Sequence, residues 1–363
     1  MKIKELTQYL ERLAPLSLQE SYDNSGLLIG SPGKEVHKAL ITLDVTHAVL
    51  DEAISKGAGL IIAHHPLIFK ALKRLRGGNL VEDLVIKAIK NDVAVYAMHT
   101  NLDNVSGGVN ARLAKQLGLK NIQVLDPAGK LKKVVVFVPE SHLGQVRTAM
   151  MEAGAGHIGN YSHCSFVSHG EGSFKALEGT HPFVGKQGEL HYEKEARLET
   201  IVPDTLLNNV LQAMQAVHPY EEVAFDIYDL ENKSITTGSG MTGELPEAMD
   251  PLDFLSMVKT RLGALAVRHG WLIDRKVKKV AICGGSGSFL MEKAFRRGAD
   301  AFVTADLKYH DFFLYQNQMI LVDAGHYETE QFTKELIFDY LKEKFPTFAL
   351  QISEENTNPV SFM

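Results

Sequence analysis

Cysteine is almost missing from this chain, since its 363 residues include only Cys164 and Cys283. The two lie far apart and form no CxxC pair, which excludes a disulfide framework and a zinc site built from thiolates. No stretch reaches 18 uninterrupted apolar residues, and the charged segment at residues 1–15 lacks the pattern of a secretion signal. We therefore expect a cytoplasmic protein without a membrane span.

An excess of basic residues is also missing. Lys and Arg number 38 against 44 Asp and Glu, a net charge of −6, so nucleic acid is a poor candidate for a partner. Hydrophobic residues make up 45% and charged residues 23%, which is typical of folded globular chains and excludes extensive disorder. At roughly 150 residues per domain, the length indicates about two domains.

Short apolar runs alternate with helical patterns in both halves of the chain. The first half contains runs at 38–45, 59–63 and 93–98, with helices expected at 46–57, where Thr46 is the predicted cap, and at 80–90. The rhythm returns after residue 275, with runs at 277–285, 299–306 and 319–326 and a long final helix from about 328 to 345. This βαβ order predicts an α/β fold with largely parallel sheets that are covered on both faces.

The segment between about residues 130 and 235 has a different order. Its strand and helix patterns read βαββαβ, which is a complete ferredoxin-like motif, with a glycine-rich loop at 170–190 and a linker expected at 232–243. Residues 128–240 hold nine basic and fourteen acidic residues. We predict a discontinuous α/β domain, residues 1–128 and 238–363, interrupted by an inserted ferredoxin-like domain, 129–237. Three consecutive domains would leave each half only three or four strands.

Histidines and carboxylates follow the predicted strands. In open α/β sheets, ligands bind beyond the carboxyl ends of strands. The side chains found at these ends are His64 and His65; His99 and Asp103; Asp306 and His310; and His326 and Glu330. A single pair such as His326 and Glu330 is more often a capping or exposed pair. The convergence of four strand ends instead indicates a metal site.

Adjacent strand residues point to opposite sides, so we expect two nearby ions, one for His64 and one for His65. Glu330 or Asp103 could bridge them, and water would fill the remaining positions, as in a reactive site. Mixed nitrogen and oxygen ligands suit divalent zinc, which we expect first, or manganese, iron, cobalt or nickel. His99, Asp306 and His310 are candidates for orienting ligands or binding substrate, and no catalytic base can be assigned.

Three other features have competing interpretations. The loop CGGSGSFL at 283–290 is either an anion-binding loop or a plain tight turn, and we prefer the tight turn. Cys283 fits a buried apolar position better than a nucleophile. The inserted segment has histidines and a cysteine that we interpret as scattered surface groups in preference to a second metal site: His157, His163, Cys164, His169, His181 and His191.

Six motifs, in order, resemble signatures of one family across the whole chain. They are ESYDNSGLLIG, IIAHHPLIF, HTNLDNVSGGVN, CGGSGSFL, TADLKYHD and VDAGHYETE. The family is that of type 2 GTP cyclohydrolase I, the Nif-three-like dinuclear-metal proteins. HIGNYSHCSFVSHGEGSF and HPYEEVAFDIY are similar to motifs of the P-II/CutA-like insert of its longer bacterial members. Tyr22 stands where the family commonly has Trp.

The resemblance implies two divalent metal ions held by the five residues that the strand ends had selected, namely His64, His65, Asp103, His326 and Glu330. It also implies a hydrolase whose metal-activated water attacks a purine nucleotide or a similar small molecule. The alternative it implies is a metal-binding regulatory or interaction protein that uses a P-II-like sensing domain and has no GTP cyclohydrolase activity. A homo-oligomer, a hexamer by resemblance, is expected in either case.

Overall fold

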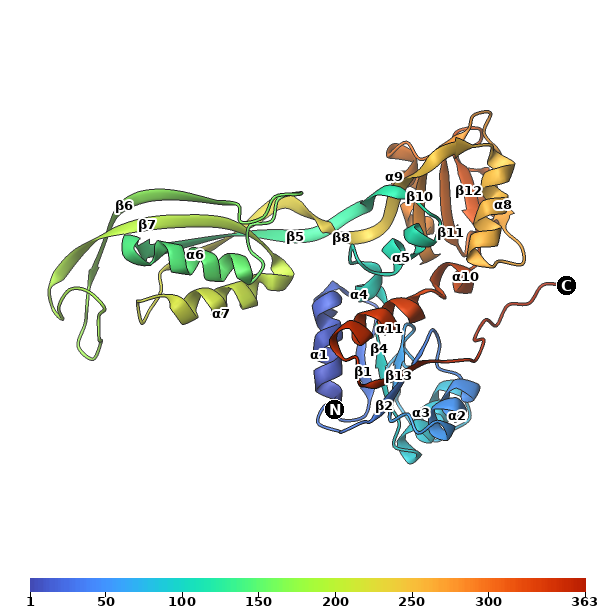
Figure 1. Cartoon of the computed structure of the whole chain (residues 1–363), viewed down its shortest axis with the longest axis horizontal. Helices are drawn as coiled ribbons and strands as arrows, with labels where there is room; N and C mark the ends of the chain where they lie inside the picture. The colour runs from blue at the N-terminus through green and yellow to red at the C-terminus, as the bar shows by residue number, and fades with distance from the viewer. The chain divides into compact units, whose positions relative to one another are not determined.

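The computed structural model describes all 363 residues, which divide into two compact units (Figure 1). One unit, which we call the main unit, comprises residues 1–127 and 236–363; the inserted unit comprises residues 128–235. The chain enters the inserted unit along β5 (Lys120–Pro139) and leaves it along β8 (Phe225–Met249). The expected linker at 232–243 is therefore wrong, because these residues continue a strand whose far end pairs with β10.

A five-stranded sheet forms one half of the main unit. Its order is β1 (Gly26–Ile29), β4 (Ala94–Ala97), β3 (Leu60–Ala63), β2 (Lys38–Thr42) and β13 (Ala349–Ile352). The last four strands are parallel, and β1 is antiparallel to β4. Every residue of β3 and β4 is buried, as expected for parallel strands covered on both faces.

Four helices cover this sheet. Helices α2 (His47–Ser55) and α3 (Leu80–Lys90) pack on one face, and α1 (Ile3–Leu13) and α11 (Thr333–Lys344) on the other. The predicted cap is confirmed, since Thr46 Oγ1 accepts a hydrogen bond from the Val49 amide. The short helices α4 (Thr100–Asp103) and α5 (Val109–Gln116) follow β4.

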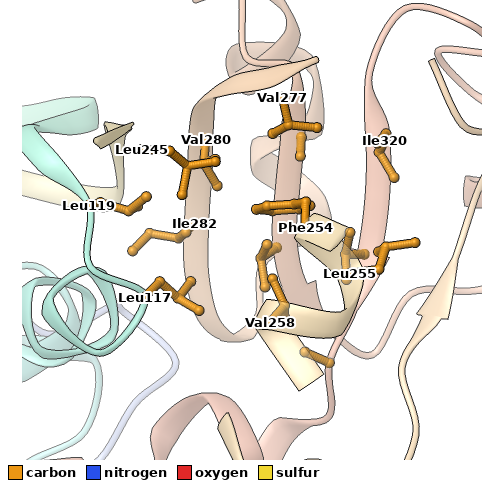
Figure 2. Packing of buried hydrophobic residues seen from close by; sticks show 14 of the residues in the cluster. Leu117, Leu119, Leu245, Phe254, Leu255, Val258, Val277, Val280, Ile282 and Ile320 are labelled. Carbon is orange, nitrogen blue, oxygen red and sulfur yellow. The ribbon is translucent and has the colours of Figure 1, made fainter. Parts of the chain in front are cut away.

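A second sheet forms the other half of the main unit, which agrees with the predicted α/β domain of largely parallel sheets. Its order is β8, β10 (Val277–Ser286), β11 (Ala301–Ala305), β12 (Ile320–Asp323) and β9 (Arg268–His269), with β10, β11 and β12 parallel. Helix α9 (Met291–Arg296) covers one face. On the other, α8 (Pro251–Leu262) packs Phe254 and Val258 near Val277, Val280 and Ile282 (Figure 2).

Two helices differ from the prediction. We did not predict α8, although Pro251 in its first turn and the left-handed Gly263 at its end are typical boundary signals. The long final helix is in fact α10 (His326–Glu330) followed by α11. The break occurs because Phe332 packs in the core of the second sheet, whereas Ile337 and Leu341 of α11 pack in the core of the first.

The inserted unit has the predicted βαββαβ order. It contains β5, α6 (Leu143–Glu152), β6 (Ser165–Lys175), β7 (Leu190–Pro203), α7 (Leu207–Val217) and β8, with strand order β6-β7-β5-β8. Val146 and Met150 of α6 and Val210 and Met214 of α7 pack on one face of the sheet. The predicted fold class, an α/β chain interrupted by a ferredoxin-like unit, is confirmed. The glycine-rich loop is shorter than expected, because β6 continues to Lys175.

The remaining regular elements are five short 3₁₀ helices, listed here with their bounds: Leu16–Leu18, Glu140–His142, Asp204–Leu206, Ser288–Leu290 and Tyr309–Phe313. The last replaces a helix expected between β11 and β12. None of the helices combines the length and the apolar character needed to span a bilayer.

A buried histidine makes the inserted unit sensitive to pH. The Nε2–H of His218 donates to the Phe137 carbonyl, and its Nδ1 accepts from the Tyr220 amide, each at 3.1 Å. Burial lowers the pKa of His218 below 6.5, and the charge of His142 adds to the shift. A proton on Nδ1 would also break the bond from Tyr220.

The unfolded chain therefore binds this proton more readily, and we predict that the inserted unit is fully stabilised above pH 6.5 and loses stability as the pH falls below it. Urea unfolding at pH 7.5 and 5.5, with hydrogen exchange reporting on the inserted unit, measures the effect. The pH dependence should shrink in His218→Gln and persist in His157→Gln, which changes an exposed histidine. Equal pH dependence in wild type and His218→Gln would contradict the prediction.

Candidate metal centre

The selected histidines and carboxylates lie at the ends of strands in both sheets. His64 and His65 follow β3, and Asp103 ends α4 just after β4. His326 and Glu330 are the first and last residues of α10, which follows β12. The fold therefore brings together side chains that are separated by more than 200 positions in the sequence.

The Glu330 carboxylate is the common partner of three imidazoles. Its Oε2 lies 2.9 Å from His65 Nε2, 3.1 Å from His326 Nε2 and 3.8 Å from His64 Nε2. Glu330 is only 3% exposed. Ligand atoms of His64, His65 and Glu330 all lie within 4.8 Å of one another, a spacing that suits a bound metal ion.

Each imidazole is fixed through Nδ1 and presents Nε2 to Glu330. The Nδ1 partners, all at 2.7 Å, are the Met98 carbonyl for His64, the Asp44 carboxylate for His65 and the Asp306 carboxylate for His326. Metal-binding histidines in proteins are held in the same way, because a hydrogen bond at one ring nitrogen sets the tautomer and the orientation of the other.

Two buried polar atoms in the cluster have no hydrogen-bond partner, namely His64 Nε2 and Asp103 Oδ1. They lie 3.8 Å apart, too far for a hydrogen bond. Leaving such atoms unsatisfied costs about 1–3 kcal/mol each, and a cation between nitrogen and oxygen donors would satisfy both. The residues present therefore fit a divalent metal ion.

The two adjacent histidines do not diverge as we expected. Their ring centroids lie 4.8 Å apart, and both Nε2 atoms lie within 4 Å of Glu330 Oε2. Alternation holds within a strand, but β3 ends at Ala63, and His64 and His65 occupy the bend that follows it. The argument for two ions from alternation is therefore wrong, although a shared carboxylate remains compatible with either number.

The carboxylates around the cluster set its protonation. Burial opposes charge on His65, but Asp44 and Glu330 outweigh it and raise the pKa of His65 to about 10. At His326, burial again disfavours the charged form, but the nearby carboxylates of Glu330 and Asp306 outweigh it and raise the pKa to about 9. Burial and the charge of Glu330 raise the pKa of Asp103 to about 7. The site thus attracts positive charge, as protons or as a metal ion.

The three candidate orienting residues lie in different places. Asp306, at a left-handed φ of 57°, holds His326 as described above. His99 donates from Nδ1 to Asp23 at 2.7 Å, and its ring lies 5.4 Å from that of His64. His310 is exposed and contacts the rings of Tyr309 and Phe313, outside the cluster.

Sequence reasoning missed two carboxylates that orient histidines, Asp44 and Asp23. Asp44 lies just beyond β2, so the strand-end rule would have found it had we applied the rule to that strand. Asp23 lies in a turn before β1 and also accepts hydrogen bonds from the amide and hydroxyl of Thr100. No pattern of spacing marks Asp23, although it stands within the first of the six motifs.

The loop at 283–290 packs against the candidate metal cluster. The Gly284 and Gly285 amides are bound by Asn110 Oδ1 and Thr329 Oγ1, each at 3.0 Å, so neither is free to cradle an anion. Gly285 has a φ of +60°, and a Cβ there would lie 2.2 Å from Glu330 Oε1. Cys283 is buried, and burial together with nearby carboxylates raises the pKa of its thiol, as expected of a packing residue.

A cavity of about 410 Å³ opens beside Glu330 and Asp103. His99 lines it, as do the rings of Tyr22 and Phe289, which are 63% and 65% exposed. Glu20 adds a further carboxylate, and none of the residues lining the cavity is Lys or Arg.

The residues of the inserted unit that we interpreted as scattered surface groups lie at or near the surface. His157, His163 and His181 are exposed, and Cys164 is partly exposed. His169 pairs with Glu140 and His191 with Glu193. No second group of three such side chains with metal-ligand spacing occurs in the structure.

Comparisons with known proteins give consistent results. A profile of the family described as Duf34/NIF3 (NGG1p interacting factor 3) matches residues 1–359. A "GTP cyclohydrolase 1 type 2 homolog" of Halalkalibacterium halodurans is 44% identical over 362 residues, covering 98% of this chain and 97% of the relative. A Bacillus subtilis protein of the same description is 43% identical over 370 residues, covering 99% and 98%. The crystal structure of a Bacillus cereus protein related to NIF3 superposes with a TM-score of 0.89 at 43% identity, covering 100% of this chain and 99% of that one.

The close approach of Gly285 to Glu330 leads to a prediction. Gly285→Ala should lower the free energy of unfolding by the left-handed backbone cost of roughly 1–2 kcal/mol and, in addition, by displacing Glu330 from its imidazoles. Gly298→Ala is the matched control, since Gly298 has a φ of +71° and open space around its Cβ position. Urea unfolding of both variants measures the difference, and equal losses would contradict a supporting contact at Gly285.

Proposed function

Because this chain belongs to the Duf34/NIF3 family, whose curated relatives are named GTP cyclohydrolase 1 type 2 homologs, we propose that it is a metal-dependent hydrolase of small molecules. The observation that carries the proposal is the buried Glu330 carboxylate shared by three imidazoles that are each fixed through Nδ1. His64, His65, Asp103, His326 and Glu330 would hold two divalent ions.

Such ions would supply Lewis-acid activation of a water nucleophile. The protein's own residues prepare the site for that chemistry. Glu330 Oε2 faces three imidazoles and would hold metal together with them, and Asp44 and Asp306 hold His65 and His326 in place. Because the cluster lies between two sheets and is largely buried, its charges act in a medium of low dielectric constant.

The cavity beside Asp103 suits a planar substrate. Tyr22 and Phe289 present exposed rings there, on which a heteroaromatic ring would stack. His99, fixed by Asp23, lines the same cavity and would orient a polar group of the substrate. A purine nucleotide is the substrate that the relatives' names suggest. No Lys or Arg lines the cavity. The metal ions would therefore supply the positive charge that the phosphates of such a substrate need.

The metal site has a direct test. Elemental analysis of the purified protein should find about two transition-metal equivalents per chain, zinc being the ion expected first. His64→Ala and Glu330→Gln should each lose most of this metal, because each removes a ligand from the buried cluster. His310→Ala is the control and should retain it, since His310 lies outside the cluster. Undiminished metal in both ligand variants would overturn the proposed site.

A regulatory role is the second candidate, and a cavity in the inserted unit favours it. This cavity, of about 450 Å³, is lined by Phe174, Phe183, Tyr220 and Glu195. The Tyr220 hydroxyl donates to Glu195 at 2.8 Å. A complete ferredoxin-like unit with its own pocket suits a sensor of a small ligand.

Activity toward GTP separates the two candidates. The metal-loaded protein incubated with GTP should release formate and form a pteridine product, detected by enzymatic formate assay and by fluorescence. Glu330→Gln should abolish turnover, with His310→Ala as the active control. Full metal content without turnover of GTP would favour another substrate or the regulatory role.

A further inference from the structure

The last ten residues of the chain, 354–363, form a segment that we call the C-terminal tail. It follows β13 and has no regular secondary structure, yet two of its side chains make hydrogen bonds with carboxylates around the metal cluster. Thr357 Oγ1 donates to Asp44 Oδ2 at 2.7 Å, and Asn358 Nδ2 donates to Glu328 Oε1 at 3.0 Å.

Thr357 is connected to a proposed ligand through a single residue. Asp44 uses one carboxylate oxygen for Thr357 and the other for His65 Nδ1, and His65 Nε2 faces Glu330. The hydroxyl therefore fixes the rotation of the carboxylate that in turn fixes the imidazole. Without it, Asp44 Oδ2 would have no protein donor in the structure, and the carboxylate could turn away from His65.

Asn358 donates a hydrogen bond to the helix that carries His326 and Glu330. Glu328 is a buried carboxylate, 8% exposed, in the helix that carries His326 and Glu330. A buried carboxylate needs donors, and Asn358 supplies one. The two tail residues thus connect Asp44, which follows a strand of the first sheet, with α10, which follows a strand of the second.

The tail also forms a wall of a second cavity next to the cluster. This cavity, of about 470 Å³, is lined by His65 and His326 and by Pro359, Val360 and Phe362 of the tail. It differs from the cavity beside Asp103, which contains no tail residue. The tail and two proposed ligands therefore line one cavity.

We propose that the C-terminal tail is a working part of the metal centre. Thr357 is a positioning residue that orients His65 through Asp44, and residues 359–362 restrict access to His65 and His326 from the cavity that they line together, a role that we call shielding. The inference rests on the proposed metal site. Partners of ligating histidines typically change metal affinity 10- to 100-fold when they are removed, so the effect of a residue one step further out should lie near the lower end of that range.

Metal affinity tests the positioning role. Competition with a chromogenic zinc chelator should show about tenfold weaker zinc binding in Thr357→Val, because valine keeps the shape but removes the donor. Thr357→Ser should restore wild-type affinity, which a purely steric role would not predict. Glu355→Gln, an exposed change in the same tail, is the control. Wild-type affinity in Thr357→Val would overturn the positioning role.

Shielding has a test that needs no metal. Diethyl pyrocarbonate modifies accessible imidazoles, and mass spectrometry gives the rate at each histidine in the metal-free protein. In a chain that ends at Asn358, which keeps Thr357 and Asn358, modification of His65 and His326 should be several-fold faster than in wild type, whereas exposed His310 should react at an unchanged rate. Equal rates at His65 and His326 in both proteins would overturn the shielding role.

The two tests also distinguish failure of the inference from failure of the proposed function. A wild-type protein that takes up no zinc would contradict the metal site, and the modification rates would still decide whether the tail covers the histidines. A wild-type protein that binds zinc, with no change in Thr357→Val, would contradict the role of Thr357 alone. Thermal unfolding of each metal-free variant identifies any loss that comes from misfolding.

Discussion

The arrangement of the two sheets in the main unit depends on one buried carboxylate. Glu330 is removed from water between two sheets, and a buried charge without partners costs several kcal/mol. Its partners come from both sheets, with His64 and His65 after β3 and His326 in its own helix. Electrostatic satisfaction of Glu330 therefore requires the two sheets to lie in one arrangement. The glycine at 285 follows from the same constraint, because any larger residue would occupy the space of the carboxylate.

Much of the main unit was predictable because local signals agree with the tertiary structure. Buried parallel strands produce continuous apolar runs, and the residues directly after them meet at one edge, which is why His64, His326 and Glu330 were found without any knowledge of the fold. The outer strand of the first sheet was not predictable in this way. It depends on β13 pairing with β2 across more than 300 residues, and no local pattern encodes that pairing. The break before α11 has the same cause, since Phe332 and Ile337 pack on different sheets.

The supporting residues were harder to predict than the proposed ligands. Asp23 and Thr357 lie in segments without periodicity, and each contacts the site through hydrogen bonds to residues far away in the sequence. The inserted unit shows the opposite case. Its βαββαβ order was correct because each of its helices follows a strand and packs back on the same sheet, which makes its contacts nearly local. The linker expected at 232–243 was wrong, because β8 continues where glycines and polar residues suggested a linker.

The pairing of β13 with β2 also has a consequence for biosynthesis. The ribosome releases the N-terminal strands first, and until residues 349–352 emerge β2 remains at an open edge of its sheet, with unpaired backbone groups that can pair with another chain. The intervening segment includes the whole inserted unit, which can complete its own sheet in the meantime. At 5–20 residues per second, roughly 15–60 seconds separate the synthesis of the two strands. During that interval the nascent chain depends on chaperones or on rapid folding of the rest to avoid aggregation.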